Sequence, residues 1–373
     1  MTSSFSDLPD ALVRDLLAVA TPVAERVAND LGRLARARSS VRGRARELGL
    51  VHRKADLDVT REPSVVGIDG SYQIHRLAAL DLCAAASVAV EGSSREARRF
   101  WQEPYHHMWV ECVEHSKDAT NALRGVMISM EIDLASAAPH DLVMLDGSFV
   151  VLLIYLNQGL TSFRRAPAGL TRAFTARWQQ GTLEKFLGLL VSERTMAIPK
   201  YSARNELEAV VEGMDVPQLD GKTLATMLLE PDEYAGPLPI FNFAGEDEEY
   251  HLPVEFCPVE TQRRMNDAIG ALRVVFYRPY AWSPAVRLEL PSSIATSRAR
   301  LALALEGVQR QFFSPAVLEP YPLFLADRMV KSLGAGVSVI EQAVAQHAAE
   351  VSEDLEGTLL HLQNYRTEGG RGS

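Results

Sequence analysis

The chain has 373 residues, which is enough for one large domain or two smaller ones with a substantial buried core. Its 47% hydrophobic and 23% charged residues are typical of a globular protein and exclude one that is disordered overall. The formal net charge of −10 excludes a surface that is basic throughout, so any contact with nucleic acid must come from local basic patches.

The cysteines and the apolar segments indicate the compartment. Cys83, Cys112 and Cys257 are widely spaced and form no CxxC motif, which favours a reducing environment over a disulfide framework. The N-terminus lacks the basic and apolar stretches of a signal peptide. The apolar run from Phe149 to Leu156 is too short to span a bilayer as a helix. We therefore expect a soluble, cytoplasmic protein without membrane contact.

Residues 5–50 are predicted to be helical, because apolar side chains recur every three or four positions between Leu12 and Leu31. Between Arg33 and Lys54 the segment is strongly basic and contains a single acid, Glu47. Such a run is typical of a solvated helix face, and the alternative is a contact with a phosphate backbone or a protein partner.

Two Asp-Gly-Ser triplets follow apolar, strand-like runs, and they place Asp69 and Asp146 at the ends of those runs. An Asp-Gly pair between apolar runs is also a common hairpin turn. The repetition of the whole triplet favours two aspartates that neighbouring strands deliver to one place. Since Mg²⁺ and Mn²⁺ prefer hard oxygen ligands, this pattern predicts a divalent-metal site.

The first triplet is expected to begin a meander of strands that opens an α/β domain. A turn after Asp69 would lead to a strand from Tyr72 to Leu80, and a third strand would run from Leu82 to Val90.

Residues 116–137 have the apolar spacing of a helix, and Glu131 lies at the margin of its apolar face. A glutamate there is seldom buried unless it is paired or binds a metal. The alternatives are a surface ion pair with Arg124, or a site in which Asp133 takes the place of Glu131.

Residues 149–156 form a strand or a buried helix, and residues 161–180 combine basic and aromatic side chains without an acid. Arginine pairs with phosphates and aromatic faces stack on bases, so this segment is a candidate for binding single-stranded nucleic acid. An exposed helix with packed aromatics is an equal alternative. The candidate residues are Arg164, Arg165, Arg172, Arg177 and Trp178.

The second half of the chain offers weaker signals. Lys200 follows a short apolar run, where a third strand could bring a cation to the site, although a surface lysine is the default. Residues 205–245 are predicted to be helical and then loop-like, and residues 246–249 to be a solvated acidic turn. Strands are expected at 273–277 and 286–290, helices at 324–333 and 337–362, and a flexible tail from 367.

In this order, the features resemble the NurA nuclease family over roughly residues 60–335. They are the two Asp-Gly-Ser triplets, the helix with its internal glutamate, Lys200, and a late Tyr-Pro-Leu segment with an acid a few residues on. The resemblance implies an α/β fold with an RNase H-like mixed central sheet flanked by helices, and helical N-terminal and C-terminal extensions. The implied division is a basic helical segment 1–60, a nuclease domain 61–340, and a C-terminal helix and tail 341–373.

The resemblance also implies site residues and an activity. Asp69, Glu131 and Asp146 would be metal ligands, and Lys200 would lie near the scissile phosphate. The last ligand is commonly histidine in the family, whereas Asp327 stands here. Members are described as Mn²⁺-dependent nucleases, exo- or endonucleolytic, that act as homodimers on DNA with a hexameric HerA-type ATPase. The implied function is DNA end processing or defence, with Mg²⁺ as an alternative cofactor.

Two other functions fit the same residues. One is a phosphatase or nucleotide hydrolase that uses the same carboxylates on small phosphate esters. The other is a non-catalytic partner subunit of a motor ATPase. The chain contains no GxxxxGK[ST] motif, so it is not expected to be the motor itself.

Overall fold

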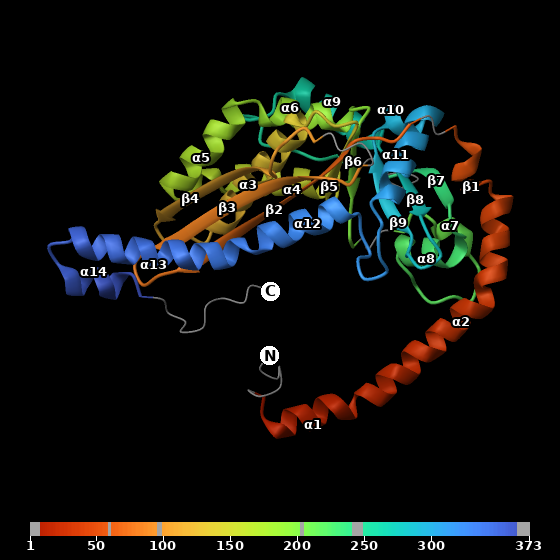
Figure 1. Ribbon diagram of the computed structural model, residues 1–373, viewed down its shortest axis with the longest axis horizontal. Coiled ribbons are helices and arrows are strands. Elements are labelled where there is room, and N and C mark those ends of the chain that lie inside the picture. The colour runs from red at the N-terminus through yellow and green to blue at the C-terminus, as the bar shows by residue number, and fades with distance from the viewer. Residues whose placement is uncertain (1–7, 59–60, 95–98, 202–204, 241–248, 364–373) are drawn as a thin grey trace.

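The computed structural model describes residues 8–58, 61–94, 99–201, 205–240 and 249–363. Its centre is a nine-stranded sheet in the order β1-β7-β8-β9-β6-β5-β2-β3-β4 (Figure 1). The strands are β1 (Val51–Arg53), β2 (Val65–Arg76), β3 (Asp81–Glu91), β4 (Tyr105–Val113), β5 (Leu142–Asp146), β6 (Thr195–Ile198), β7 (Glu233–Pro239), β8 (Arg273–Arg278) and β9 (Val286–Leu290). β5 runs parallel to β2 and β6, and the other neighbours are antiparallel. The predicted mixed α/β sheet flanked by helices is therefore confirmed.

Helices cover both faces of this sheet (Figure 1). They are α1 (Asp10–Ala18), α2 (Ala20–Glu47), α3 (Ala119–Ala137), α4 (Phe149–Ser162), α5 (Ala168–Gln179), α6 (Thr182–Leu190), α7 (Glu208–Val211), α8 (Gly221–Leu228), α9 (Val259–Gly270), α10 (Ser292–Ala295), α11 (Arg298–Arg310), α12 (Tyr321–Lys331), α13 (Leu333–Val351) and α14 (Leu355–His361). Two short 3-10 turns, η1 (Lys54–Asp56) and η2 (Phe163–Arg165), complete the set.

The strands separate two large hydrophobic cores. Successive side chains of a strand point to opposite faces, and β2 follows this rule. Val66 and Ile68 belong to the core that includes α3 and α4, whereas Val65 belongs to the core that includes α11 and the start of α12. A residue's position along β2 or β5 therefore decides which layer of helices it meets.

The expected turn after Asp69 is wrong. β2 continues without interruption to Arg76, and Gly70 and Ser71 pair with Ser87 and Ala86 of β3. β3 offers antiparallel partners along the whole of β2, so the chain reverses only after Arg76. The Asp-Gly pair is thus part of a long strand and does not form a hairpin turn.

Three further expectations are settled by the structure. Residues 149–156 form helix α4, which Ser148 caps by accepting a hydrogen bond from the Val150 amide. The proline-rich stretch expected to be a loop contains β7, whose pairing with β8 shifts register near Pro237; prolines are tolerated at such irregularities. The single helix expected over 337–362 is two helices, because Asp354 caps a new one. The predicted acidic turn at 246–249 and the tail from 367 fall largely outside the described residues.

Both extensions contact the central sheet. β1 pairs with β7, and the second half of α2 packs on α7 and α8. Within the basic run, Arg42 donates hydrogen bonds to Glu233 at 2.8 Å. In the C-terminal extension, Glu341 of α13 hydrogen-bonds to His75 of β2 at 2.9 Å. The division at residues 60 and 340 stays a prediction, and the basic run is used at least partly to dock α2 within the chain.

Candidate metal centre

Two neighbouring parallel strands bring Asp69 and Asp146 together. Ile68 of β2 pairs with Leu145 of β5, so the aspartates that follow them lie side by side. Both share the strand face of Val65 and Leu142, which is the face toward α11 and α12. This is the arrangement that the repeated Asp-Gly-Ser triplet predicted.

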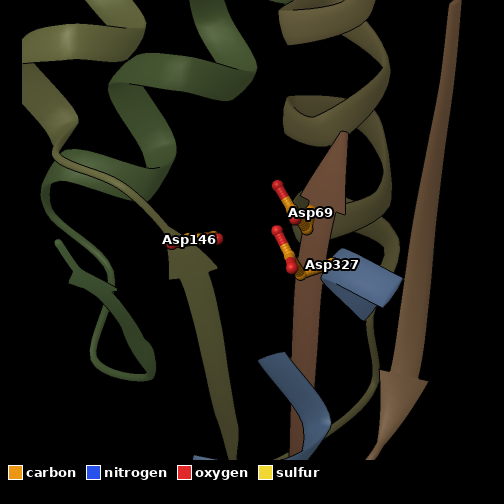
Figure 2. Close-up of side chains that lie close together, drawn as sticks. All are labelled: Asp69, Asp146 and Asp327. Carbon is orange, nitrogen blue, oxygen red and sulfur yellow. The ribbon is translucent and has the colours of Figure 1, made fainter. Parts of the chain in front are cut away.

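Asp327 reaches the same point from helix α12, as Figure 2 shows. One carboxylate oxygen from each of Asp69, Asp146 and Asp327 lies within 4.8 Å of the other two. The helix comes this close because Gly67 has no side chain. A Cβ built on Gly67 would lie 2.6 Å from the backbone nitrogen of Leu323. A glycine two residues before Asp69 therefore sets the approach of the helix that carries Asp327.

Lys200 lies beside this cluster, just beyond the end of β6. Its Nζ is 2.8 Å from Asp146 and 3.2 Å from both Asp327 and Glu319. Burial lowers the pKa of Lys200, but the nearby carboxylates, Asp146 foremost, more than offset this and raise the pKa above its usual value. The ammonium is consequently charged at any pH at which the protein would be assayed.

Glu131 approaches from the opposite side of β2. It is 3% exposed, and its Oε1 would lie 2.4 Å from a Cβ built on Gly70. The surface ion pair with Arg124 is wrong, because the Arg124 guanidinium donates to Gln158 and to the Tyr72 hydroxyl. Glu131 lies outside the three-aspartate cluster, next to Asp69 across the strand.

Asp133, the competitor of Glu131, is used elsewhere. Its carboxylate pairs with Arg177 at 3.1 Å and with Lys185 at 2.7 Å. These contacts neutralise Asp133 between α3, α5 and α6, so the structure favours Glu131 as the acid of this helix that faces the site.

The electrostatics of the cluster suit a bound cation. Burial, followed by the charge of Asp146, raises the pKa of Asp69 to about 8. Burial and the charges of Asp69 and Asp146 also raise the pKa of Glu131 well above its usual value. Although burial raises the pKa of Asp327, its ion pairs with Lys331 and Lys200 bring it below its usual value. Crowded oxygen ligands that repel one another's charge fit a hard divalent cation, which would relieve that repulsion.

No family model matches this chain, and no curated protein matches it by sequence. Solved structures do match. The NurA nuclease from Sulfolobus solfataricus superposes with a TM-score of 0.58 at 12% identity, over 91% of this chain and 98% of that one. NurA bound to dAMP and manganese superposes with a TM-score of 0.52 at 13% identity, over 91% and 99% of the two chains. The chain has the NurA fold. The resemblance inferred from the sequence is thereby confirmed for the fold.

Sequence reasoning missed two acids that support the candidate site. Glu319 contacts Lys200, and its signal was its place just before the Pro320-Tyr321-Pro322 segment that starts α12. The buried Glu289 of β9 accepts hydrogen bonds from the Ser148 hydroxyl and the Phe149 amide, both at 2.9 Å. No local pattern distinguishes Glu289 from an ordinary strand glutamate.

Glu289 belongs to a buried ionic network. Its carboxylate pairs with Arg287, which also donates to Glu206. All three side chains are at most 2% exposed. Because Glu289 holds the first residues of α4, the network fixes the turn that directly follows Asp146.

The basic and aromatic segment of the NurA-like chain is placed on η2 and α5. Each of its four arginines pairs with an acid from another part of the chain. Arg164, Arg165, Arg172 and Arg177 pair with Glu255, Asp118, Glu111 and Asp133. Trp178 packs edge-on against Phe174 and Phe256. These acids reduce the positive charge expected from the sequence, and a DNA-binding role for the segment stays a prediction.

Within the described ranges, no helix is both long and apolar enough to cross a bilayer. The cytoplasmic location stays a prediction.

Proposed function

We propose that this protein is a divalent-metal-dependent nuclease that hydrolyses phosphodiester bonds of DNA. The observation that carries the proposal is the convergence of Asp69, Asp146 and Asp327, with Lys200 against them, in a chain of NurA fold. The fold alone would not suffice, since function depends on the site.

Asp69, Asp146 and Asp327 would hold the metal, and Glu131 would complete the ligand set across β2. Mn²⁺ is the cation we favour, with Mg²⁺ as the alternative, and the manganese-bound NurA structure supports that choice. The bound metal would supply Lewis-acid stabilisation of the phosphate and a more acidic bound water.

The remaining chemistry falls to the chain's own groups. The Lys200 ammonium, 2.8 Å from Asp146, is placed to donate to an oxygen of the scissile phosphate and to stabilise the charge that develops there. We favour DNA over small phosphate esters as the substrate, because the structurally similar NurA protein is named as a nuclease.

The finer fold assignment is also a proposal. The order β4-β3-β2-β5-β6 places three antiparallel strands beside two that run parallel to β2. This order supports the RNase H-like sheet that the resemblance implies. β2 and β5 are the first and fourth of these five strands along the chain, and they are neighbours in the sheet. Their aspartates, Asp69 and Asp146, therefore lie close together.

The partners are proposed on separate grounds. A HerA-type ATPase rests on the resemblance alone. A homodimer has support in the structure, because α1 and the first half of α2 extend away from the sheet (Figure 1). An apolar stripe on them is between 44% and 59% exposed; it consists of Leu12, Leu16, Val19, Val23, Val27 and Leu31. The same stripe on a second copy would be self-complementary.

The first test compares cleavage of end-labelled single- and double-stranded DNA with Mn²⁺, Mg²⁺ or EDTA. Replacing Asp69 by Asn keeps its shape and removes its charge, so we expect a loss of cleavage of at least about 100-fold with the fold retained. Glu260→Gln, at an exposed acid of α9 that belongs neither to the cluster nor to the basic segment, is the control and should cleave normally. A fully active Asp69→Asn protein would refute the site, and absence of cleavage with every metal would refute nuclease activity of the isolated chain.

A further inference from the structure

A cavity of about 380 Å³ opens directly beside the carboxylate site. Lys200 and Glu319, which contact each other at 3.2 Å, form the wall shared with the site. The remaining walls are mostly apolar and come from three separate segments of the chain. These residues are Ile198, Pro199, Pro284, Val286, Leu318 and Pro320.

Two further side chains give the cavity a polar and an aromatic edge. Lys222, near the start of α8, lines it and donates through Nζ to the Lys200 carbonyl at 3.3 Å. An ammonium has three donors, so this contact still allows Lys222 to bind an anion. Tyr201 lines the cavity as well and is 93% exposed, which leaves its ring accessible for stacking.

Together these features match one ligand class. Apolar walls with a few convergent polar groups are typical of small-molecule sites, and a volume of about 300–1,000 Å³ is usual for them. A purely apolar ligand would make no polar contact with the Lys222 ammonium, whereas a free anion would gain nothing from the apolar walls. A nucleotide, with a flat base and an anionic phosphate, satisfies both.

We propose that this cavity binds the deoxynucleotide adjoining the scissile phosphate, with its base against the apolar wall and Tyr201 and its own phosphate at Lys222. The inference rests on the proposed nuclease function and names where that function holds its substrate. Because Lys200 lines this cavity and also contacts Asp146 and Asp327, a nucleotide in the cavity would lie next to the carboxylate site.

The test measures binding, not cleavage. Thymidine monophosphate is titrated by calorimetry into the full-length protein in EDTA at pH 7, with thymidine and inorganic phosphate as partial ligands. Lys222→Ala should raise the Kd about tenfold or more, since a hydrogen bond to a charged group is lost. Leu318→Glu should also weaken binding by placing a negative charge on the wall; Leu318 is 52% exposed, so the core is not disturbed. Lys117→Ala, which removes an exposed cation outside the cavity, should change nothing.

Failure of thymidine monophosphate to bind, or equal binding by wild type and both cavity variants, would overturn the inference. Equal affinity for inorganic phosphate would reduce the site to an anion site and would also overturn it. The proposed function is judged separately. Metal-dependent DNA cleavage without nucleotide binding would remove only the cavity inference. Nucleotide binding without cleavage would remove the nuclease proposal and, with it, the assignment of the bound nucleotide to a place beside the scissile phosphate.

Discussion

Gly70 leaves open the space in which the Glu131 carboxylate lies. A Cβ there would come within 2.4 Å of Glu131 Oε1 and 2.9 Å of Met127 Cγ. The Glu131 carboxylate is the flexible end of its side chain, so it would move aside while the strand stays in place. The absence of a side chain at this position therefore protects the geometry of a proposed ligand.

We expect Gly70→Ala to weaken Mn²⁺ binding and DNA cleavage by about tenfold or more, because a displaced ligand loses on the order of 1–2 kcal/mol of coordination. Calorimetric titration with Mn²⁺ and the cleavage assay measure the effect. Gly188→Ala is the matched control, since a Cβ at Gly188 meets nothing within 4 Å. Unchanged metal affinity in Gly70→Ala would exclude Glu131 from the ligand set.

The raised pKa of Asp69 also predicts how the stability of the protein depends on pH. Burial and Asp146 raise its pKa to about 8 in the folded protein, from an ordinary value of 3.8. Between these values the folded state holds a proton that the unfolded state has released. The free energy of unfolding of the metal-free protein should therefore fall as pH rises from 4 to 8.

Thermal unfolding in EDTA at pH 6 and pH 8 measures this slope, and Asp69→Asn should flatten it. Since a metal must displace the same proton, Mn²⁺ affinity should rise with pH by up to about tenfold per unit below pH 8. A metal affinity that is constant from pH 6 to 8 would contradict the raised pKa of Asp69.

At the scale of elements, the start of α4 depends on a strand that is distant in sequence. Glu289 of β9 receives hydrogen bonds from Ser148 and Phe149 and is itself neutralised by Arg287. An ordinary helix cap would use a neighbouring residue. Here the local cap, Ser148, and the turn after Asp146 are also held by the buried carboxylate of Glu289.

We expect Glu289→Gln to lower the free energy of unfolding by about 3–5 kcal/mol, because Arg287 would keep a buried charge with one partner fewer. Ser148→Ala removes the local cap and one of the two hydrogen bonds to Glu289 but leaves the buried ion pair intact, so it should cost less, about 1–2 kcal/mol. Urea unfolding compares the two. Metal titration of folded Glu289→Gln should also show weaker Mn²⁺ binding, and equal stability of the two variants would refute the role of the network.

At the scale of the whole molecule, the apolar stripe of α1 and α2 is the surface proposed to pair with a second copy. We expect Val23→Glu combined with Val27→Glu to convert a dimer to a monomer, because charges would be buried at the interface. Glu25→Lys, on the opposite side of α2, is the control. Sedimentation analysis would contradict the proposal if wild type were monomeric or if the double variant remained dimeric.

The sequence by itself determined the parts of the site that are encoded locally. Asp69 and Asp146 each end an apolar run and start an Asp-Gly-Ser triplet, and this pattern needs no distant contact to be seen. The apolar runs that end at these aspartates predict the strands before them, and apolar residues three or four positions apart predict helix α3 with Glu131. The strand within residues 231–239 could not be predicted from the sequence, because β7 is held in the sheet by β1 and β8 despite its prolines.

Only the tertiary structure decided which distant groups join that site. Asp327 meets Asp69 because α12 packs on Gly67, and Lys200 meets Asp146 because β6 pairs with β5. Arg177 pairs with Asp133, and an arginine read as a contact for DNA is thereby used inside the fold. The physical reason is that packing across the sheet determines which residue lies next to each carboxylate. The local spacing of residues in the sequence carries no information about such distant contacts.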